Sequence, residues 1–297
     1  MFNEQNKARI SLIISMFVFG TIGIFRRYIP LPSGILAMAR GFIGALFLTA
    51  AILLGKKGFD TKAIKKNLPL LLISGAMIGF NWILLFEAYN YTSVATATLC
   101  YYTAPIFVIL ASPLLLREKL SAKKMICVAV SVLGMILVSG ILDADFSGIK
   151  ELTGVFLGLG AALLYASVVI MNKKIKNLQP YDKTIIQLGS AALVLLPYTL
   201  FAEDISSVKF DLTSAAMLLT VGIIHTGIAY AMYFGSMDKL KAQTAALFSY
   251  IDPVIAIILS ALILKENIGV SGYIGAALIL GATLISEIPE KKCNENC

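Results

Sequence analysis

The sequence predicts an all-α membrane protein of ten transmembrane helices, arranged as two inverted repeats of five helices. Hydrophobic residues make up 58% of the 297 residues and charged residues only 14%, whereas about a quarter of a soluble domain is charged. The apolar residues form long continuous runs with short linkers between them. Backbone groups in lipid need internal hydrogen-bond partners, so such runs indicate helices.

Ten apolar runs approach the roughly 20 residues that a membrane-spanning helix needs. In chain order they cover residues 10–25, 34–54, 68–89, 94–116, 125–142, 152–171, 185–201, 212–237, 242–264 and 270–288. The predicted repeats are residues 1–147 and 148–288, and we expect residues 289–297 to form a polar cytoplasmic tail.

Basic residues predict the orientation of these helices. With the N-terminus in the cytoplasm, 19 Lys and Arg residues fall in inner segments, five in outer segments and one within a span. This asymmetry favours both termini in the cytoplasm and a multi-pass protein of a prokaryotic inner membrane. The net charge of +8 is spread over short clusters between apolar runs, which does not indicate nucleic-acid binding. The run 10–25 lacks a cleavage pattern and is interpreted as a retained helix.

Catalytic and metal-binding patterns are absent from the sequence. The four cysteines lack zinc-site spacing, and the chain has one histidine, no nucleotide-binding Gly-x4-Gly-Lys-Ser/Thr loop and no Gly-x-Ser-x-Gly elbow. We therefore expect no metal, no cofactor and no enzyme activity, although a membrane-embedded enzyme remains the least favoured alternative.

A shift of 148 positions aligns the two halves of the chain. Ten of 23 positions from Thr96 to Glu118 are identical in the second half, including a Tyr-x-x-Pro-x12-Glu frame. Five helices per repeat invert the second copy, an arrangement typical of alternating-access transporters. Pro105 and Pro253 fall in the middle of their runs and predict a break in helix hydrogen bonding. The alternatives are a packing kink or a cavity-lining segment, and the matched pair favours the cavity.

Several of these segments resemble the EamA-type branch of the drug/metabolite transporter superfamily. They are the stretch Ala88 to Ala97, Ala104-Pro105 followed by Leu-Arg-Glu-Lys at 116–119, and the related stretches at 241–245, 252–253 and 264–267. The resemblance implies a central cavity lined by helices 1, 3, 4, 6, 8 and 9, with helices 5 and 10 at the periphery, where a homodimer contact is one option. It also implies a small-molecule substrate among amino acids, other metabolites, amines and drugs.

Ionisable residues inside apolar runs are costly and are therefore candidates for function. Asp252 and His225 lie near the centres of their runs and predict a proton relay or a site for a cationic group. The alternative is a buried pair that only fixes packing. Arg40 and Glu87 lie at similar depth and predict a structural salt bridge, while Glu87 also stays a coupling candidate.

Aromatic side chains form a second set of candidates, because aromatic faces attract organic cations. The predicted substrate-binding residues are Trp82, Tyr101, Tyr102, Tyr165, Tyr230 and Tyr250, together with Asn81, Ser249 and Asp252. Simple aromatic packing with hydroxyl bonds across helices is the alternative. With these residues we expect secondary transport of a small organic metabolite, coupled to protons or to exchange. A passive channel or a structural membrane subunit is the competing expectation.

Overall fold

A computed structural model describes residues 3–56, 58–139, 149–204, 211–265 and 269–288, and the ordered elements in these ranges are helical. The first half contains α1 (Glu4–Arg26), α2 (Ser33–Leu54), α3 (Thr61–Tyr91), α4 (Val94–Tyr101), α5 (Ala104–Leu116) and α6 (Ala122–Ser139). The second half contains α7 (Ile149–Lys174), α8 (Pro180–Ala202), α9 (Leu212–Thr220), the π-helix η2 (Val221–Ile228), α10 (Ala229–Ser236), α11 (Ala242–Phe248), α12 (Ile251–Leu264) and α13 (Val270–Glu287). The predicted tail at 289–297 lies outside the described residues.

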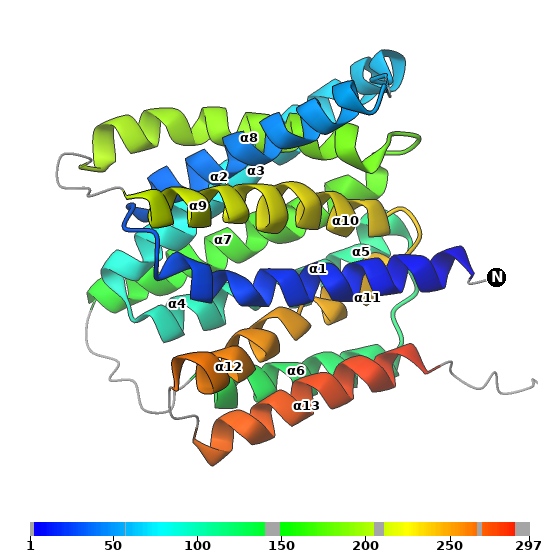
Figure 1. Ribbon diagram of the computed structural model, residues 1–297. Helices are drawn as coiled ribbons and strands as arrows, with labels where there is room; N and C mark the ends of the chain where they lie inside the picture. Colours follow the sequence, from blue (N-terminus) through cyan, green and yellow to red (C-terminus); the bar gives the residue numbers. More distant parts are fainter. Residues whose placement is uncertain (1–2, 57, 140–148, 205–210, 266–268, 289–297) are drawn as a thin grey trace, which may run out of the picture.

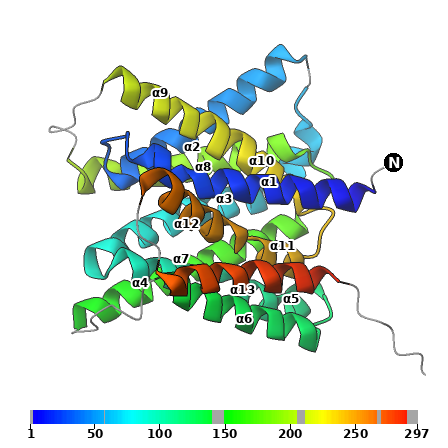
Figure 2. The same ribbon diagram turned by 60° about the horizontal axis from the view of Figure 1, so that its bottom comes forward.

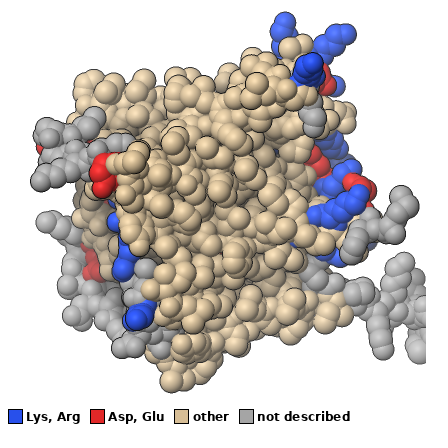
Figure 3. Space-filling model, viewed as in Figure 1, with Lys and Arg blue, Asp and Glu red and all other residues tan. Residues whose placement is uncertain are grey.

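Membrane-spanning character follows from the length and composition of these helices. Within the described ranges, eight helical segments are long and apolar enough to cross a membrane, and the segment Val270–Ser286 is a shorter apolar helix. Figure 3 shows an uncharged belt across the middle of the molecule, with Lys and Arg gathered at its two ends and most of them at the N-terminal end. The chain is therefore a multi-pass membrane protein.

The helices form one bundle in which segments far apart in sequence lie side by side (Figure 1). α3 packs against α7 and α8, and α2 packs against α8 and η2. α1 runs between the second-half segments α10 and α12, and α6 pairs with α13 at one edge, as Figure 2 shows from a second side. The interleaving of the halves places residues from both of them around the middle of the bundle.

The predicted spans 94–116 and 242–264 correspond to the candidate membrane-spanning segments Thr96–Leu116 and Ala242–Ile263, and each is broken into two helices near its proline, as predicted. α4 ends at Tyr101 and α5 begins at Ala104, while α11 ends at Phe248 and α12 begins at Ile251. Pro105 and Pro253 therefore lie in the first turn of the second helix of each pair rather than in a helix interior. A proline is well tolerated there, because a first-turn N–H has no intrahelical partner to lose.

Glycine allows α1 to approach α12 closely beside this second break. A Cβ atom at Gly20 would lie 2.7 Å from the backbone oxygen of Asp252 and 2.7 Å from the Cβ of Ile255. Gly23, one turn further along α1, has nothing within 4 Å of the corresponding position. The sequence of α1 thus includes a small residue where the contact with α12 requires one.

Two glutamates cap helices that are distant in sequence. The carboxylate of Glu203 accepts hydrogen bonds from the backbone N–H groups of Gly34 and Ile35, both at 2.7 Å, in the first turn of α2. The carboxylate of Glu118 accepts from the N–H of Ala242 at 2.7 Å and of Gln243 at 3.3 Å, in the first turn of α11. Each cap satisfies N–H groups that the helix itself leaves without partners, and each joins one half of the chain to the other.

Candidate functional site

The two helix breaks are joined by a hydrogen bond between Tyr102 and Asp252. Tyr102 follows the last residue of α4, and its hydroxyl donates to Oδ2 of Asp252 at 3.3 Å. Asp252 is the second residue of α12, where the partial positive charge of the helix N-terminus favours a carboxylate. The predicted pair of broken helices therefore does bring Tyr102 and Asp252 together, although by a different local geometry from the one expected.

An unbroken series of aromatic rings extends from this pair through the bundle. Neighbouring ring centroids are 5.7 Å apart for Tyr102 and Tyr101, 5.7 Å for Tyr101 and Tyr165, and 6.4 Å for Tyr165 and Tyr233. The Tyr165 and Tyr233 hydroxyls also lie 2.6 Å apart in a hydrogen bond. We call the complete series the aromatic chain; its members, in order, are Tyr102, Tyr101, Tyr165, Tyr233, Phe19, Tyr230 and Trp82.

The aromatic chain continues through α1 to α3. Phe19 lies 6.1 Å from Tyr233 and 5.1 Å from Tyr230, and Tyr230 lies 6.3 Å from Trp82 with the two rings perpendicular. Tyr230 and Trp82 occupy equivalent positions in the two halves, 148 residues apart. Such edge-to-face pairs each contribute about 0.5–1.5 kcal/mol beyond the burial of their surfaces.

Many of these side chains keep accessible surface although they lie between helices. Asp252, Tyr101, Tyr102, Tyr165 and Tyr230 are all partly exposed, whereas Tyr233 at 1% and Trp82 at 4% are buried. The partly exposed set combines one carboxyl group with several aromatic faces. This combination suits an organic molecule with a polar or cationic group.

Arg40 lies at the other end of the aromatic chain and does not form the predicted salt bridge with Glu87. Its guanidinium carbon is 4.4 Å from the centroid of the Trp82 ring. Glu87 instead accepts a hydrogen bond from the Tyr198 hydroxyl at 2.6 Å and from the Asn90 amide at 3.3 Å. A cation–π contact is worth about 0.5–2 kcal/mol, which is less than the several kcal/mol that an unpaired buried ion costs.

His225 does not contact Asp252, so a direct relay between these two residues is not formed. His225 lies in η2, where its Nε2 is 2.8 Å from the Thr21 hydroxyl and its ring is 4.7 Å from the ring of Phe25. α1 passes between the two candidates, since Thr21 contacts His225 and the adjacent Gly20 faces the backbone of Asp252. The His225 Nδ1 is buried without a hydrogen-bond partner among the described residues.

Three predicted site residues are held by the helix bundle itself. Asn81 is 2% exposed, and its amide donates to the carbonyl of Ala161 at 2.6 Å, joining α3 to α7. The Ser249 hydroxyl donates to the carbonyl of Ala246 in its own chain segment at 2.6 Å. Tyr250 is fully buried, and its hydroxyl has no partner within the described ranges. These contacts give Asn81 and Ser249 hydrogen bonds within the bundle, and their roles in substrate binding stay predictions.

Phe19 and Tyr233 are members of the aromatic chain that sequence reasoning missed. Tyr233 follows Tyr230 by three residues, a spacing that places both on one face of a helix. This spacing is a usable signal for Tyr233. Phe19 is one of many apolar residues in α1, and only the packing of α1 against α10 singles it out.

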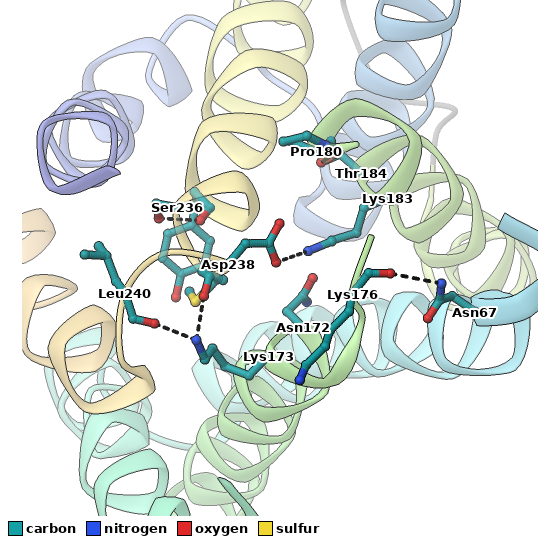
Figure 4. A network of polar contacts seen from close by, with 12 residues as sticks. Asn67, Asn172, Lys173, Lys176, Pro180, Lys183, Thr184, Ser236, Asp238 and Leu240 are labelled. Atoms are coloured by element: carbon teal, nitrogen blue, oxygen red, sulfur yellow. Dashed lines mark hydrogen bonds and ion pairs between the residues drawn. The ribbon is translucent and has the colours of Figure 1, made fainter. Parts of the chain in front are cut away.

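Polar contacts gather around the segment between α10 and α11, at the end of the bundle where the N-terminus lies (Figures 1 and 4). Lys183 is fully buried and its Nζ lies 3.2 Å from the Asp238 carboxylate. The Lys173 ammonium donates to the carbonyls of Met237 at 2.7 Å and Leu240 at 2.6 Å. These bonds hold the segment to α7 and α8.

Within the described ranges, no group of three or more His, Cys, Asp or Glu side chains is placed to hold a metal ion. The candidate site combines a carboxyl group, a guanidinium group and the aromatic rings between them.

Comparison with known proteins shows which family this chain is similar to. Residues 6–140 and 152–287 both match the EamA-like transporter family. The chain is 33% identical to the uncharacterized transporter YxxF of Bacillus subtilis over 86% of this chain and 81% of that protein. It is 25% identical to an uncharacterized transporter of Archaeoglobus fulgidus over 93% of this chain and 94% of that protein.

A solved crystal structure agrees in fold with a TM-score of 0.83, covering 94% of this chain and 96% of that chain at 17% identity. The family match covers most of the sequence and includes the helices that carry Arg40, Trp82, Tyr102 and Asp252. From these matches, the chain belongs to the EamA-like transporter family.

Proposed function

We propose that the protein is a secondary active transporter, which moves a small organic metabolite across the cytoplasmic membrane by alternating access. Its halves act as inverted five-helix repeats, both termini lie in the cytoplasm, and transport is coupled to protons or to exchange. The membership in a transporter family, the Lys and Arg asymmetry and the two broken helices at equivalent positions support this proposal.

The contact between Asp252 and Tyr102 carries the proposal. A phenol hydroxyl can donate to an ionised carboxylate and can accept from a protonated one, so the pair accommodates both protonation states of Asp252. The Tyr102 bond joins α12 to the α4–α5 break, which places a titratable group where two discontinuous helices meet. An arriving ammonium group or a proton can replace the interaction with Tyr102, while nearby aromatic faces receive the body of the substrate.

The second candidate function is a passive channel or facilitator, and a structural membrane subunit follows it. Broken helices also occur in fixed pores, but breaks at matched positions in a member of a transporter family favour alternating access. A homodimer would use α6 and α13, which pair at one edge of the bundle (Figure 1). The resemblance to EamA-type transporters places the corresponding fifth and tenth spans at the periphery.

The test uses the purified protein in liposomes. A thermal-shift screen against amino acids, amines and drugs selects a compound, and its uptake is then measured under an imposed pH gradient. The wild type is expected to accumulate the compound above the bath concentration, and Asp252→Asn and Asp252→Ala are expected to abolish pH-driven accumulation. Glu4→Gln, which removes a carboxylate at an exposed position where it pairs with Lys7, serves as the control and should retain it.

The other possible results of this assay distinguish between the candidate functions. Full pH-driven accumulation by Asp252→Asn would make Asp252 a structural hydrogen-bonding residue and would overturn the coupling role. Dissipation of a substrate gradient without accumulation would indicate a channel, and a chemically altered compound would indicate an enzyme.

A further inference from the structure

Arg40 carries a positive charge that the described protein leaves without an ion-pair partner. Its guanidinium contacts the Trp82 face at 4.4 Å, and its Nε is buried without a hydrogen-bond partner. No N–H of Arg40 donates a hydrogen bond to another described residue. Buried arginine is ordinarily paired with carboxylates or phosphates in bidentate geometry, so this group lacks the partner that its position calls for.

The groups around Arg40 cannot supply that partner. The titratable side chains near Arg40 are Tyr101, Tyr230 and His225, none of which provides a carboxylate. The one acidic residue expected to pair with Arg40 is engaged elsewhere, because Glu87 is bound by Tyr198 and Asn90. A guanidinium group that keeps its hydrogen-bond donors uncommitted is suited to receive an anion from outside the chain.

Arg40 and Asp252 lie at opposite ends of the same aromatic chain. Asp252 is bonded to Tyr102 at 3.3 Å, Arg40 lies over the Trp82 ring at 4.4 Å, and Tyr101 and Tyr230 lie near both charged groups. Both charged side chains retain accessible surface. The candidate site therefore has a cationic pole and a carboxyl pole with aromatic faces between them.

We propose that Arg40 binds the anionic group of the substrate, and that the substrate is a small organic zwitterion whose cationic group binds at Asp252. A carboxylate accepts two parallel hydrogen bonds from one guanidinium group, which compensates the Arg40 charge inside the bundle. Stacking on Trp82 holds the guanidinium plane in place before the anion arrives. This inference rests on the proposed transport function, and it adds to it the requirement for an anionic group.

The test compares three matched series of probes on the purified full-length protein. The probes are linear ω-amino acids of three to six carbons, the alkylamines that lack their carboxylate, and the carboxylates that lack their amine. Apparent dissociation constants come from ligand-induced changes in melting temperature. For the wild type, we expect at least one ω-amino acid to bind about tenfold more tightly than its matching amine, a difference of about 1.4 kcal/mol.

Variants of Arg40 assign this preference to one residue. Arg40→Gln should weaken binding of the preferred ω-amino acid about tenfold and change binding of the matching amine less than about twofold, while Arg40→Lys keeps part of the preference. Lys7→Gln removes the same charge at an exposed position and should change neither. If Arg40→Gln does not fold, the comparison of probes on the wild type still decides the substrate class.

Two results would overturn the proposal. One is equal or weaker wild-type binding of every ω-amino acid relative to its matching amine. The other is a preference for the ω-amino acid over its matching amine that is as large in Arg40→Gln, or in Arg40→Lys, as it is in the wild type. In either case pH-driven accumulation that depends on Asp252 would leave the transport function standing, because that assay does not involve Arg40.

Discussion

The cap that Glu203 provides to α2 makes a quantitative prediction about stability. The N-cap residue of α2, Pro32, makes no side-chain cap bond, so the carboxylate of Glu203 is the side chain that binds the first-turn N–H groups of Gly34 and Ile35. Both bonds are 2.7 Å long, and both donors are buried. Glu203→Ala therefore removes two charge-assisted hydrogen bonds at once.

The expected loss can be bounded from these contacts. A hydrogen bond to a charged group contributes about 1.5–3 kcal/mol, and loss of a helix cap costs about 0.5–2 kcal/mol. Glu203 is only partly buried, so water replaces some of each bond and a total of about 2–3 kcal/mol is expected. At roughly 2–4 °C per kcal/mol for a large domain, the melting temperature should fall by about 4–12 °C.

Thermal unfolding of the purified protein, followed by intrinsic fluorescence, measures this change. Glu203→Gln should lose about half as much as Glu203→Ala, because one amide oxygen remains to accept a bond. Glu4→Gln is the control: Glu4 pairs with Lys7 at an exposed position, where such a pair is worth about 0–1 kcal/mol. A melting temperature for Glu203→Ala within about 1 °C of that of Glu4→Gln would refute the reasoning.

Three further predictions concern packing, a predicted site residue and orientation. Gly20→Ala should destabilise the protein by about 1–3 kcal/mol, since the new Cβ would lie 2.7 Å from atoms of α12, whereas Gly23→Ala should not; equal melting temperatures would contradict this. Asn81→Ala should lower stability by about 0.5–1.5 kcal/mol through loss of the hydrogen bond that joins α3 to the Ala161 carbonyl of α7 without changing which probes bind, and altered probe selectivity would instead return Asn81 to the binding site. Cysteines introduced at Lys62 and Lys124 should be labelled from the same side of the membrane, and labelling from opposite sides would refute the predicted topology.

Sequence reasoning predicts the apolar helices well because their signal is local. The runs 10–25 and 34–54, for example, correspond to α1 and α2 within a few residues at most ends, apart from the earlier start of α1 at Glu4. Composition over about 20 residues decides such a segment, and neighbouring helices do not alter it. The position of the break at Pro105 was predicted correctly, but Pro105 lies in the first turn of α5 and not, as expected, in a helix interior. A proline in a helix interior and a proline in a first turn present the same local sequence, and tertiary packing decides between them.

Charged partners were harder to predict than aromatic ones. Arg40 and Glu87 share a depth and have opposite charges, yet the hydroxyl of Tyr198 occupies the carboxylate of Glu87. Depth along a span does not specify which face of the helix a side chain occupies, nor which helix lies beside it. Trp82 and Tyr230, both predicted site residues, are in contact with each other.

The π-helix η2 makes the number of residues in its segment as important as their identity. A π turn closes its hydrogen bonds over five residues rather than four, and the Thr226 hydroxyl bonds the carbonyl of Val221 across that interval at 3.0 Å. The equivalent residues 73–80 of the first half are ordinary α-helix. An α-helix turns by about 100° per residue, and a π-helix turns by less because its hydrogen bonds span five residues. If the same residues wound as α-helix, everything after η2 would be rotated around the helix axis and the direction of Tyr230 relative to Trp82 would change, although no residue had been replaced.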